Sequence, residues 1–277
     1  MPRLELEYPK EALNSVKRLG DRGVYALRTI HQIINSSRLV HVSFNVPDSP
    51  FPATLPMIGQ MGSFARPSAD EGEVLDLYLH GYVSARMANL SRKSTAGGQE
   101  QGVGGGLPVC ISASHVDGLV LALSPFSSSY NYRSAVLFGY AELVSDEEER
   151  LYAMELITDS VVPGRWRDAR GPPTPAELQS TSILRVKVKS GSAKVRAGEP
   201  HDDSRDMADT ELCARVWSGV VPVHETIGEP IPGPSNSRAV PAYIKDYVKD
   251  SNEVSAETAK QAAVEPPKKK KAEGSDD

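Results

Sequence analysis

Short segments with a two-residue hydrophobic period follow one another along this chain, and this order limits its fold more than any other feature. In "RLVHVSFNV", Val40, Val42, Phe44 and Val46 alternate with polar residues, which predicts a strand with one buried face. Downstream, "EVLDLYLHGY" predicts another strand, with its leucines on one face and His80 at the end of the other. Because helical segments do not alternate with these strands, an antiparallel sheet is favoured over parallel βαβ winding.

Further extended segments complete the predicted sheet. Pro56 interrupts "ATLPMIGQM", and a proline without an N–H predicts a sheet edge or a bulge at that position. The segment "LPVCISASHVDGLVLAL" predicts a hairpin that turns at Asp117–Gly118. Single strands are predicted for "YRSAVLFGYAELV", "SILRVKVKS" and "LCARVWSGVVPV".

Helical patterns occupy three places beside these strands. Apolar residues at three- and four-residue spacing predict a helix within residues 16–35. Ser145 and Glu148 form a capping-box pattern before a second long helix, and Thr174 and Glu177 form another before a short helix. Several short strands with two long helices predict a mainly β, α+β protein, built as an antiparallel barrel or sandwich with flanking helices.

The composition changes after residue 228 and divides the chain in two. Residues 1–228 predict one folded domain, in which the Gly-rich polar stretch 91–106 predicts a flexible insert. Residues 229–277 are first rich in Pro, Gly and Ser and then in Ala, Glu and Lys. This composition predicts a largely disordered C-terminal tail.

Charge and cysteine content exclude several kinds of partner. The net charge of -5 argues against a uniformly basic nucleic-acid-binding surface. No apolar run reaches the ~18 residues that span a bilayer, and the N-terminal segment lacks the apolar centre of a secretory signal. Cys110 and Cys213 form no CxxC pair and predict buried free thiols. We expect a cytoplasmic protein, although "PPKKKK" at 266–271 is typical of nuclear import as well as of a solubilising tail.

His80 and the polar residues that follow it form the first candidate site. A strand end followed by Ser84 and Arg86 offers a hydroxyl and a guanidinium to a phosphate. The plain alternative is a strand histidine satisfied by a carbonyl or water, followed by a solvated arginine. In the basic loop at 162–170, Trp166 would either stack on a flat ring or pack as a plug. The six histidines show no metal-site spacing, so we expect no metal.

Ordered segments of the chain resemble the pyridoxamine-5'-phosphate-oxidase-like, FMN-binding split barrels, in the branch that includes the nitroimidazole-resistance proteins. Each segment alone is weak, but their order and spacing from about Lys17 to Val223 make the match specific. The resemblance implies a six-stranded split barrel that dimerises and holds FMN at the subunit interface. It rests on "RLGDRGVYALRTIHQII", "LVHVSFNVPDSPFPATLPM", "LYLHGYVSARMANL", "NYRSAVLFGYAELV", "VVPGRW" and "WSGVVPV".

The same resemblance implies roles for individual residues. The "ATLPM" segment would contact the flavin ring through backbone groups, and His80 would lie beside the ring as the candidate catalytic residue. Ser84 and Arg86 would lie near the phosphate, although the family usually has Gly-Arg-Lys where this chain has Ser84-Ala85-Arg86. The complete set of predicted cofactor-binding residues is Thr54, Leu55, Met57, His80, Ser84, Arg86, Tyr132, Arg133, Ser134 and Trp166.

Three functions remain open at this point. The first is an FMN-dependent oxidoreductase that acts on a small flat substrate, with NADH or NADPH docking transiently as donor and His80 exchanging a proton. The second is a non-catalytic module that stores flavin or binds haem through His80. The third is an interaction protein with a degenerate pocket. Pyridoxamine-phosphate oxidase activity itself is not expected, because the tail after "WSGVVPV" lacks that enzyme's Arg-x-His segment.

Overall fold

The computed structural model describes residues 5–82, 86–96 and 105–265, and the chain forms two compact units. The long strands β6, β7 and β8 contribute residues to both units. This division does not follow the predicted boundary at residue 228. The first unit contains residues 1–15, 24–114 and 134–193, and the second contains residues 16–23, 115–133 and 194–277.

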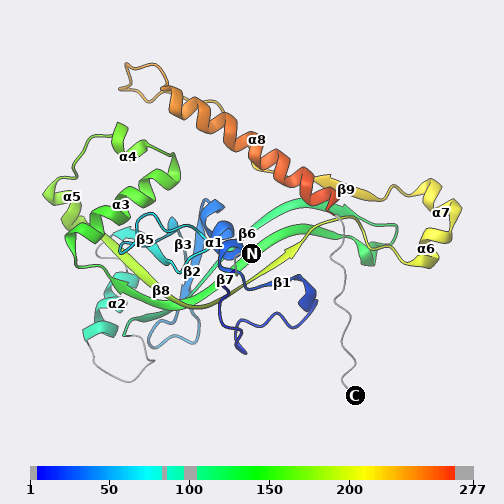
Figure 1. The fold of residues 1–277 in the computed structure, drawn as a ribbon, viewed down its shortest axis with the longest axis horizontal. Coiled ribbons are helices and arrows are strands. Elements are labelled where there is room, and N and C mark those ends of the chain that lie inside the picture. The colour runs from blue at the N-terminus through cyan, green and yellow to red at the C-terminus, as the bar shows by residue number, and fades with distance from the viewer. Residues whose placement is uncertain (1–4, 83–85, 97–104, 266–277) are drawn as a thin grey trace. The chain divides into compact units, whose positions relative to one another are not determined.

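A nine-stranded sheet has the strand order β3-β2-β6-β7-β8-β5-β4, with β1 and β9 off this path (Figure 1). Strand β2 pairs antiparallel with β3 and β6, and β5 pairs antiparallel with β4 and β8. The strand bounds are β1 Gly23–Val24, β2 Val40–Phe44, β3 Ala53–Met57, β4 Gly59–Gly62, β5 Asp76–Tyr82, β6 Leu107–Leu121, β7 Ser129–Leu143, β8 Thr181–Arg196 and β9 Gly219–Pro222.

The first and last strands of this order are consecutive in the chain. Only Ile58 separates β3 from β4, so the sheet must curl back on itself, yet the two strands are not hydrogen-bonded neighbours. Such a curled sheet with an open seam is a split barrel, and the predicted mainly β, antiparallel architecture with flanking helices is confirmed. Pro56 lies in β3, at one end of the strand order, as the prediction of an edge position required.

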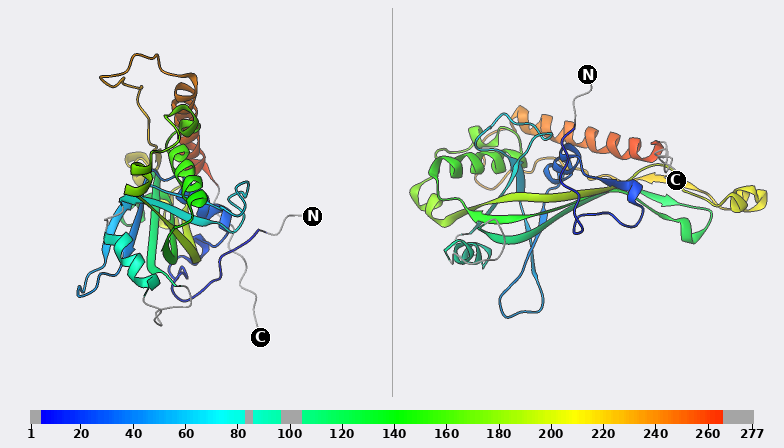
Figure 2. Two further views of the ribbon diagram at one scale, coloured as in Figure 1. Left: turned by 90° about the vertical axis from the view of Figure 1, so that its left-hand side faces the viewer. Right: turned by 60° about the horizontal axis from the view of Figure 1, so that its bottom comes forward.

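The barrel interior is filled by the apolar face of each strand. Val40, Val42, Leu77 and Leu79 are fully buried. A Cβ atom at Gly59 would lie 2.8 Å from Leu79 Cδ2 and 3.0 Å from Val40 Cγ2, so a larger residue at the start of β4 would force these buried side chains to shift. Figure 2 shows the loop between β2 and β3 projecting away from the barrel.

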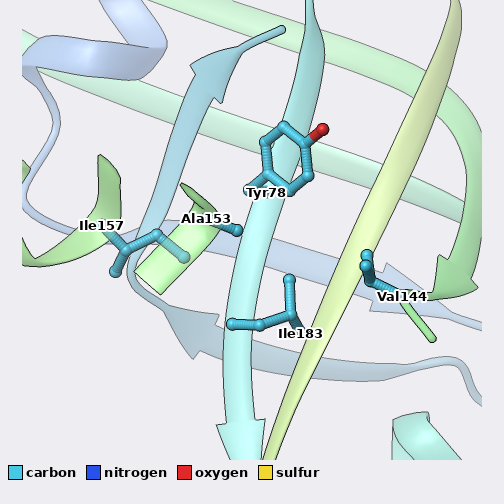
Figure 3. Packing of buried hydrophobic residues seen from close by; sticks show 5 residues of the cluster. All are labelled: Tyr78, Val144, Ala153, Ile157 and Ile183. Carbon is cyan, nitrogen blue, oxygen red and sulfur yellow. The ribbon is translucent and has the colours of Figure 1, made fainter. Parts of the chain in front are cut away.

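Helix α3, Glu147–Val161, covers the outer face of the sheet. Tyr78 and Ile183 on the sheet pack against Ala153 and Ile157 on the helix, together with Val144 (Figure 3). These five side chains form an apolar cluster separate from the barrel interior. The prediction of a second long helix with acidic residues in its first turn is confirmed.

Polar contacts fix the first turn of α3. Its N-cap is Asp146, one residue after the predicted Ser145, and its carboxylate accepts from the Glu149 N–H at 2.8 Å. The hydroxyl of Tyr78 donates to Glu149 Oε1 at 2.8 Å, and Arg185 Nη1 donates to the same oxygen at 2.8 Å. Burial and the Glu149 carboxylate raise the pKa of Tyr78 well above its usual range, so the phenol remains a hydrogen-bond donor.

Helix α8, Ala242–Val264, lies where the sequence predicted a disordered tail, so that prediction is wrong for these residues. Ala259 and Ala263, one helical turn apart, are buried. Asn131 Nδ2 donates to the carbonyl of Ala262 at 3.0 Å. This carbonyl lies in the last turn of the helix, where carbonyl groups have no hydrogen-bond partner within the helix. Alanines pack closely without large side chains, so a low content of large apolar residues was a poor indicator of disorder here.

Several other predictions are corrected. Strand β6 is continuous through Asp117–Gly118, where a hairpin turn was predicted, and β9 pairs with its end. The first helix begins only at Leu27, and "LCAR" belongs to a helix rather than to a strand. Helix α2 continues into the predicted flexible insert, whose residues 97–104 lie outside the described part of the chain. The remaining elements are η1 Gly20–Arg22, α1 Leu27–Ser36, α2 Arg86–Ala96, η2 Pro125–Ser127, α4 Arg165–Asp168, α5 Pro175–Ser180, α6 Ser204–Ala208 and α7 Thr210–Arg215.

The environments of the two cysteines differ from one another. Cys110 is half-buried on β6, and burial raises the pKa of its thiol, whereas Cys213 is exposed and so departs from the predicted buried thiol.

No described helix combines the length and the apolar character that crossing a membrane would require.

A buried histidine links the N-terminal segment to the barrel. His31 on α1 is fully buried, and its Nδ1 lies 2.8 Å from the carbonyl oxygen of Glu71. A carbonyl can only accept, so Nδ1 carries the hydrogen and Nε2 accepts from the Tyr8 hydroxyl at 2.7 Å. Burial lowers the pKa of His31 to about 4, which keeps the ring neutral near pH 7.

We predict that the free energy of unfolding decreases as the pH falls from about 6.5 to about 4. The His31 pKa is about 4 in the folded chain and returns to 6.5 on unfolding, so the unfolded state binds the proton first and is favoured. The full loss is about 3 kcal/mol. Urea unfolding across this range should show the slope in the native chain and in the His41→Gln control, and a flatter profile in His31→Gln. Parallel profiles for His31→Gln and the native chain would contradict this account.

Candidate functional site

A cavity of about 440 Å³ lies between the outer face of the sheet and the segment that runs from α3 to α5. Its sheet wall contains His80, Thr181 and Ile183, and its floor is largely apolar. This volume lies in the range of small-molecule sites, about 300–1,000 Å³. All of the lining residues belong to the first unit.

Strand alternation directs His80 into this cavity. Leu77 and Leu79 of β5 point into the barrel, so Tyr78 and His80 lie on the outer face. Tyr78 is covered by α3, whereas His80, one step further along the strand, is exposed and lines the cavity. Its direct partner across the β5–β8 ladder is Ile183, which lines the cavity as well.

The opposite wall is formed where α3 ends and α4 begins. Gly164 adopts φ 79° at the N-cap of α4, a left-handed conformation that glycine adopts with little strain. The backbone N–H of Trp166 donates to Asp159 Oδ1 of α3 at 2.7 Å. Trp166 is half-buried and lines the cavity together with Arg165.

The outer rim of the cavity is held by an ion pair and a capping box. Arg170 Nη2 donates to Glu177 Oε1 at 2.5 Å, and both side chains line the cavity. Thr174 caps α5 with the reciprocal Glu177 contacts that the sequence predicted, so this capping box is confirmed. The Arg170 guanidinium, followed by Thr174, lowers the pKa of Glu177 to about 2, so its carboxylate stays ionised at all ordinary pH values.

A smaller cavity of about 200 Å³ adjoins the first one. The two cavities share Ile58 and Val161, and the smaller one is also lined by Ser37, Arg38 and Gln60. A ligand in the larger cavity therefore has a neighbouring space on the side of β4.

Of the predicted site residues, His80 and Trp166 are brought together, although they are 86 positions apart in the sequence. The predicted ring-binding segment lies nearby, because Ile58, which directly follows β3, lines the cavity. Thr54 and Leu55 are exposed on β3 and Met57 is half-buried there. Since β3 ends the strand order, one edge of it has no ladder partner among the described strands, and its backbone groups on that edge are available to a ligand.

Of the other predicted residues that the structure describes, Arg86, Tyr132, Arg133 and Ser134 do not line this cavity. Arg86 is exposed at the start of α2, and Ser134 is half-buried on β7. Tyr132 and Arg133 belong to the second unit. Ser84 lies outside the described residues. The site roles of these residues remain predictions.

The guanidinium of Arg133 is already engaged. Its Nε and Nη2 atoms each donate to Asp117 at 2.9 Å, in a bidentate pair whose carboxylate is only 5% exposed. This pair gives Arg133 a structural role, and its predicted role in the pocket remains a prediction. Both residues belong to the second unit.

The sequence reading missed the charged lining residues Arg165, Arg170 and Glu177. In the basic loop at 162–170, the sequence predicts a role only for Trp166. The capping-box pattern at Thr174 was the available signal, since it fixes Glu177 and thereby the partner of Arg170. Among the described residues, no group of three or more His, Cys, Asp or Glu is arranged to hold a metal ion.

Comparison with known proteins identifies the family. Residues 27–195, more than half of the chain, match the family described as pyridoxamine 5'-phosphate oxidase, and the chain belongs to this family. The predicted family is therefore confirmed. A search of curated protein sequences gave no match.

Two solved structures are similar over nearly their whole length. The flavocytochrome Anf3 from Azotobacter vinelandii is 28% identical, with a TM-score of 0.66, covering 86% of this chain and 97% of that chain. The FAD and heme binding protein from Mycobacterium smegmatis is 26% identical, with a TM-score of 0.65, covering 82% of this chain and 97% of that chain.

We predict that Arg133→Ala lowers the free energy of unfolding by roughly 2 kcal/mol, because it leaves the buried Asp117 carboxylate unpaired. Arg86→Ala removes an exposed arginine and should change stability by less than about 0.5 kcal/mol. Adding Asp117→Asn to Arg133→Ala should recover part of the loss, since no charge is then buried alone. Urea unfolding measures all three variants, and equal stability of Arg133→Ala and Arg86→Ala would exclude a structural role for the pair.

Proposed function

We propose that this chain is a flavin-binding protein that holds FMN with its ring system in the His80–Trp166 cavity and catalyses oxidoreduction of a small flat substrate. The observation that carries the proposal is this cavity, in a chain whose fold is similar to those of a flavocytochrome and of an FAD and heme binding protein. Family membership supports the same reading.

The residues present fit a flavin. Ile58, Ile157 and Ile183 provide an apolar surface for a flat ring, and Trp166 adds an aromatic wall. The unpaired edge of β3 offers backbone N–H and C=O groups, which suit the polar edge of the ring. Arg165 and Arg170 place positive charge at the rim, which suits a phosphate.

The protein's own part in the reaction is binding, orientation and proton exchange. When bound, the flavin supplies the hydride or electron transfer. His80 lines the cavity from the sheet and is the group that would give or take a proton beside the ring. The apolar floor excludes water from one side of the ligand.

The assembly and the electron donor belong to the same proposal. We infer a cytoplasmic homodimer in which a second copy covers the open side of the cavity. Exposed apolar side chains of the first unit support a covered surface, namely Phe51 in the loop before β3, Leu55 on β3 and Tyr82 at the end of β5. A nicotinamide donor, NADH or NADPH, would dock transiently on the exposed face of the ring.

A second candidate cofactor is haem, bound through His80. An exposed imidazole in an apolar cavity is the kind of ligand that haem iron takes in many proteins, and arginines at the rim suit the haem carboxylates. Of the two similar structures named above, one is a flavocytochrome and the other is an FAD and heme binding protein.

The purified chain, supplied with FMN and dialysed, is predicted to retain the visible absorption bands of oxidised flavin and to lose them when NADPH or NADH is added. Trp166→Leu should weaken FMN binding by at least about tenfold, because it removes a large aromatic contact from the cavity. His41→Ala removes an exposed histidine of β2 and should leave FMN affinity unchanged. A colourless protein after dialysis would exclude FMN as the cofactor.

The haem candidate is tested with haemin in the same way. If haem is the cofactor, the native chain and His41→Ala should show a Soret band typical of a histidine ligand, and His80→Ala should lose it. If FMN alone is the cofactor, haemin should give the same spectrum with His80→Ala as with the native chain. Retention of neither FMN nor haemin would reject both candidates.

A further inference from the structure

We propose that Asp159 positions Trp166 as the ring-recognition residue of the cavity. This inference rests on the proposed function, because it concerns the same cavity. Asp159 is a positioning residue, since it acts through Trp166.

The first step is the connection between α3 and α4. Asp159 lies in the last turn of α3, and its carboxylate accepts from the backbone N–H of Trp166 at 2.7 Å. This N–H lies in the first turn of a four-residue helix, where such groups have no partner within the helix. A charged acceptor makes this bond stronger than a neutral one would.

The second step is the stiffness of the connecting turn. The N–H of Arg165 donates to the carbonyl of Val162 at 3.1 Å, and the N–H of Ala169 donates to the carbonyl of Arg165 at 3.0 Å. Gly164 takes the left-handed φ of 79° that this path requires. With Asp159 tying the turn to α3, the backbone of Trp166 has little freedom, so its side chain is presented from a fixed position.

The third step is the arrangement of the two cavity walls. Trp166 comes from the helical wall, while His80 and Ile183 come from the sheet. An aromatic side chain on one wall and a row of apolar and imidazole groups on the other favour a flat ligand between them. If Trp166 only packed against the sheet as a plug, its side chain would fill the space between the two walls. Instead, a cavity of about 440 Å³ remains there.

The test uses the fluorescence of Trp166. The other tryptophan, Trp217, is 63% exposed and does not line the cavity, so Trp217→Phe leaves Trp166 as the single reporter. In this background we expect FMN to quench the fluorescence on binding.

The positioning role is tested by three variants in the same background. Asp159→Ala should weaken FMN binding by about tenfold and reduce the quenching at saturation, because the indole is no longer held in place. Asp159→Asn should keep affinity within about threefold, since its amide oxygen still accepts the hydrogen bond. Glu155→Ala removes an exposed carboxylate from the same helix and should behave as the parent.

The outcomes separate this inference from the proposed function. FMN binding without quenching would overturn the inference and leave flavin binding intact. Equal FMN affinity and equal quenching in Asp159→Ala and Glu155→Ala would overturn the positioning role, even if Asp159→Ala lowers the melting temperature. Quenching by haemin but not by FMN would support ring recognition by Trp166 and reject FMN. Binding of neither FMN nor haemin would overturn both.

Discussion

The hydrogen bond from Tyr78 to Glu149 is the contact on which the candidate site depends. It ties the first turn of α3 to the outer face of β5, and Arg185 reinforces it by donating to the same carboxylate oxygen. With the N-terminal half of α3 held on the sheet, the C-terminal end of the helix and the segment up to α5 can enclose a cavity over His80. Strand β5 thus has two different faces. Leu77 and Leu79 pack in the barrel interior, whereas Tyr78 contacts α3 and His80 lines the cavity on the other face.

Much of the fold could be predicted because two-residue hydrophobic alternation reports directly on which strand face is buried. The errors arose where one local signal had two physical explanations. Asp117–Gly118 is a common turn pair, but here Gly118 permits a close approach of β9, since a Cβ atom would lie 2.8 Å from Val220 Cγ1. Likewise, a segment poor in large apolar residues was taken for a disordered tail, whereas buried alanines at 259 and 263 belong to helix α8.

The candidate site could be predicted only in part, because a cavity is made by contacts between distant segments. His80 followed from its place on the polar face of β5, and Trp166 followed from its chemistry, but nothing local indicated that they share one cavity. The sequence context of Arg133 could not reveal Asp117 as its bidentate partner, because the two residues lie on neighbouring parts of different strands. Arg165, Arg170 and Asp159 were missed because the role of each depends on how the segment after α3 turns back toward the sheet.

A crystal structure of the chain with bound FMN is the most direct test of the central claim, which is that the space between the sheet and the α3–α5 segment is the ring site. The account predicts electron density for the flavin ring between His80 and Trp166, with the phosphate on the side of Arg165 and Arg170. Flavin density at another place, with this cavity filled only by solvent, would contradict it.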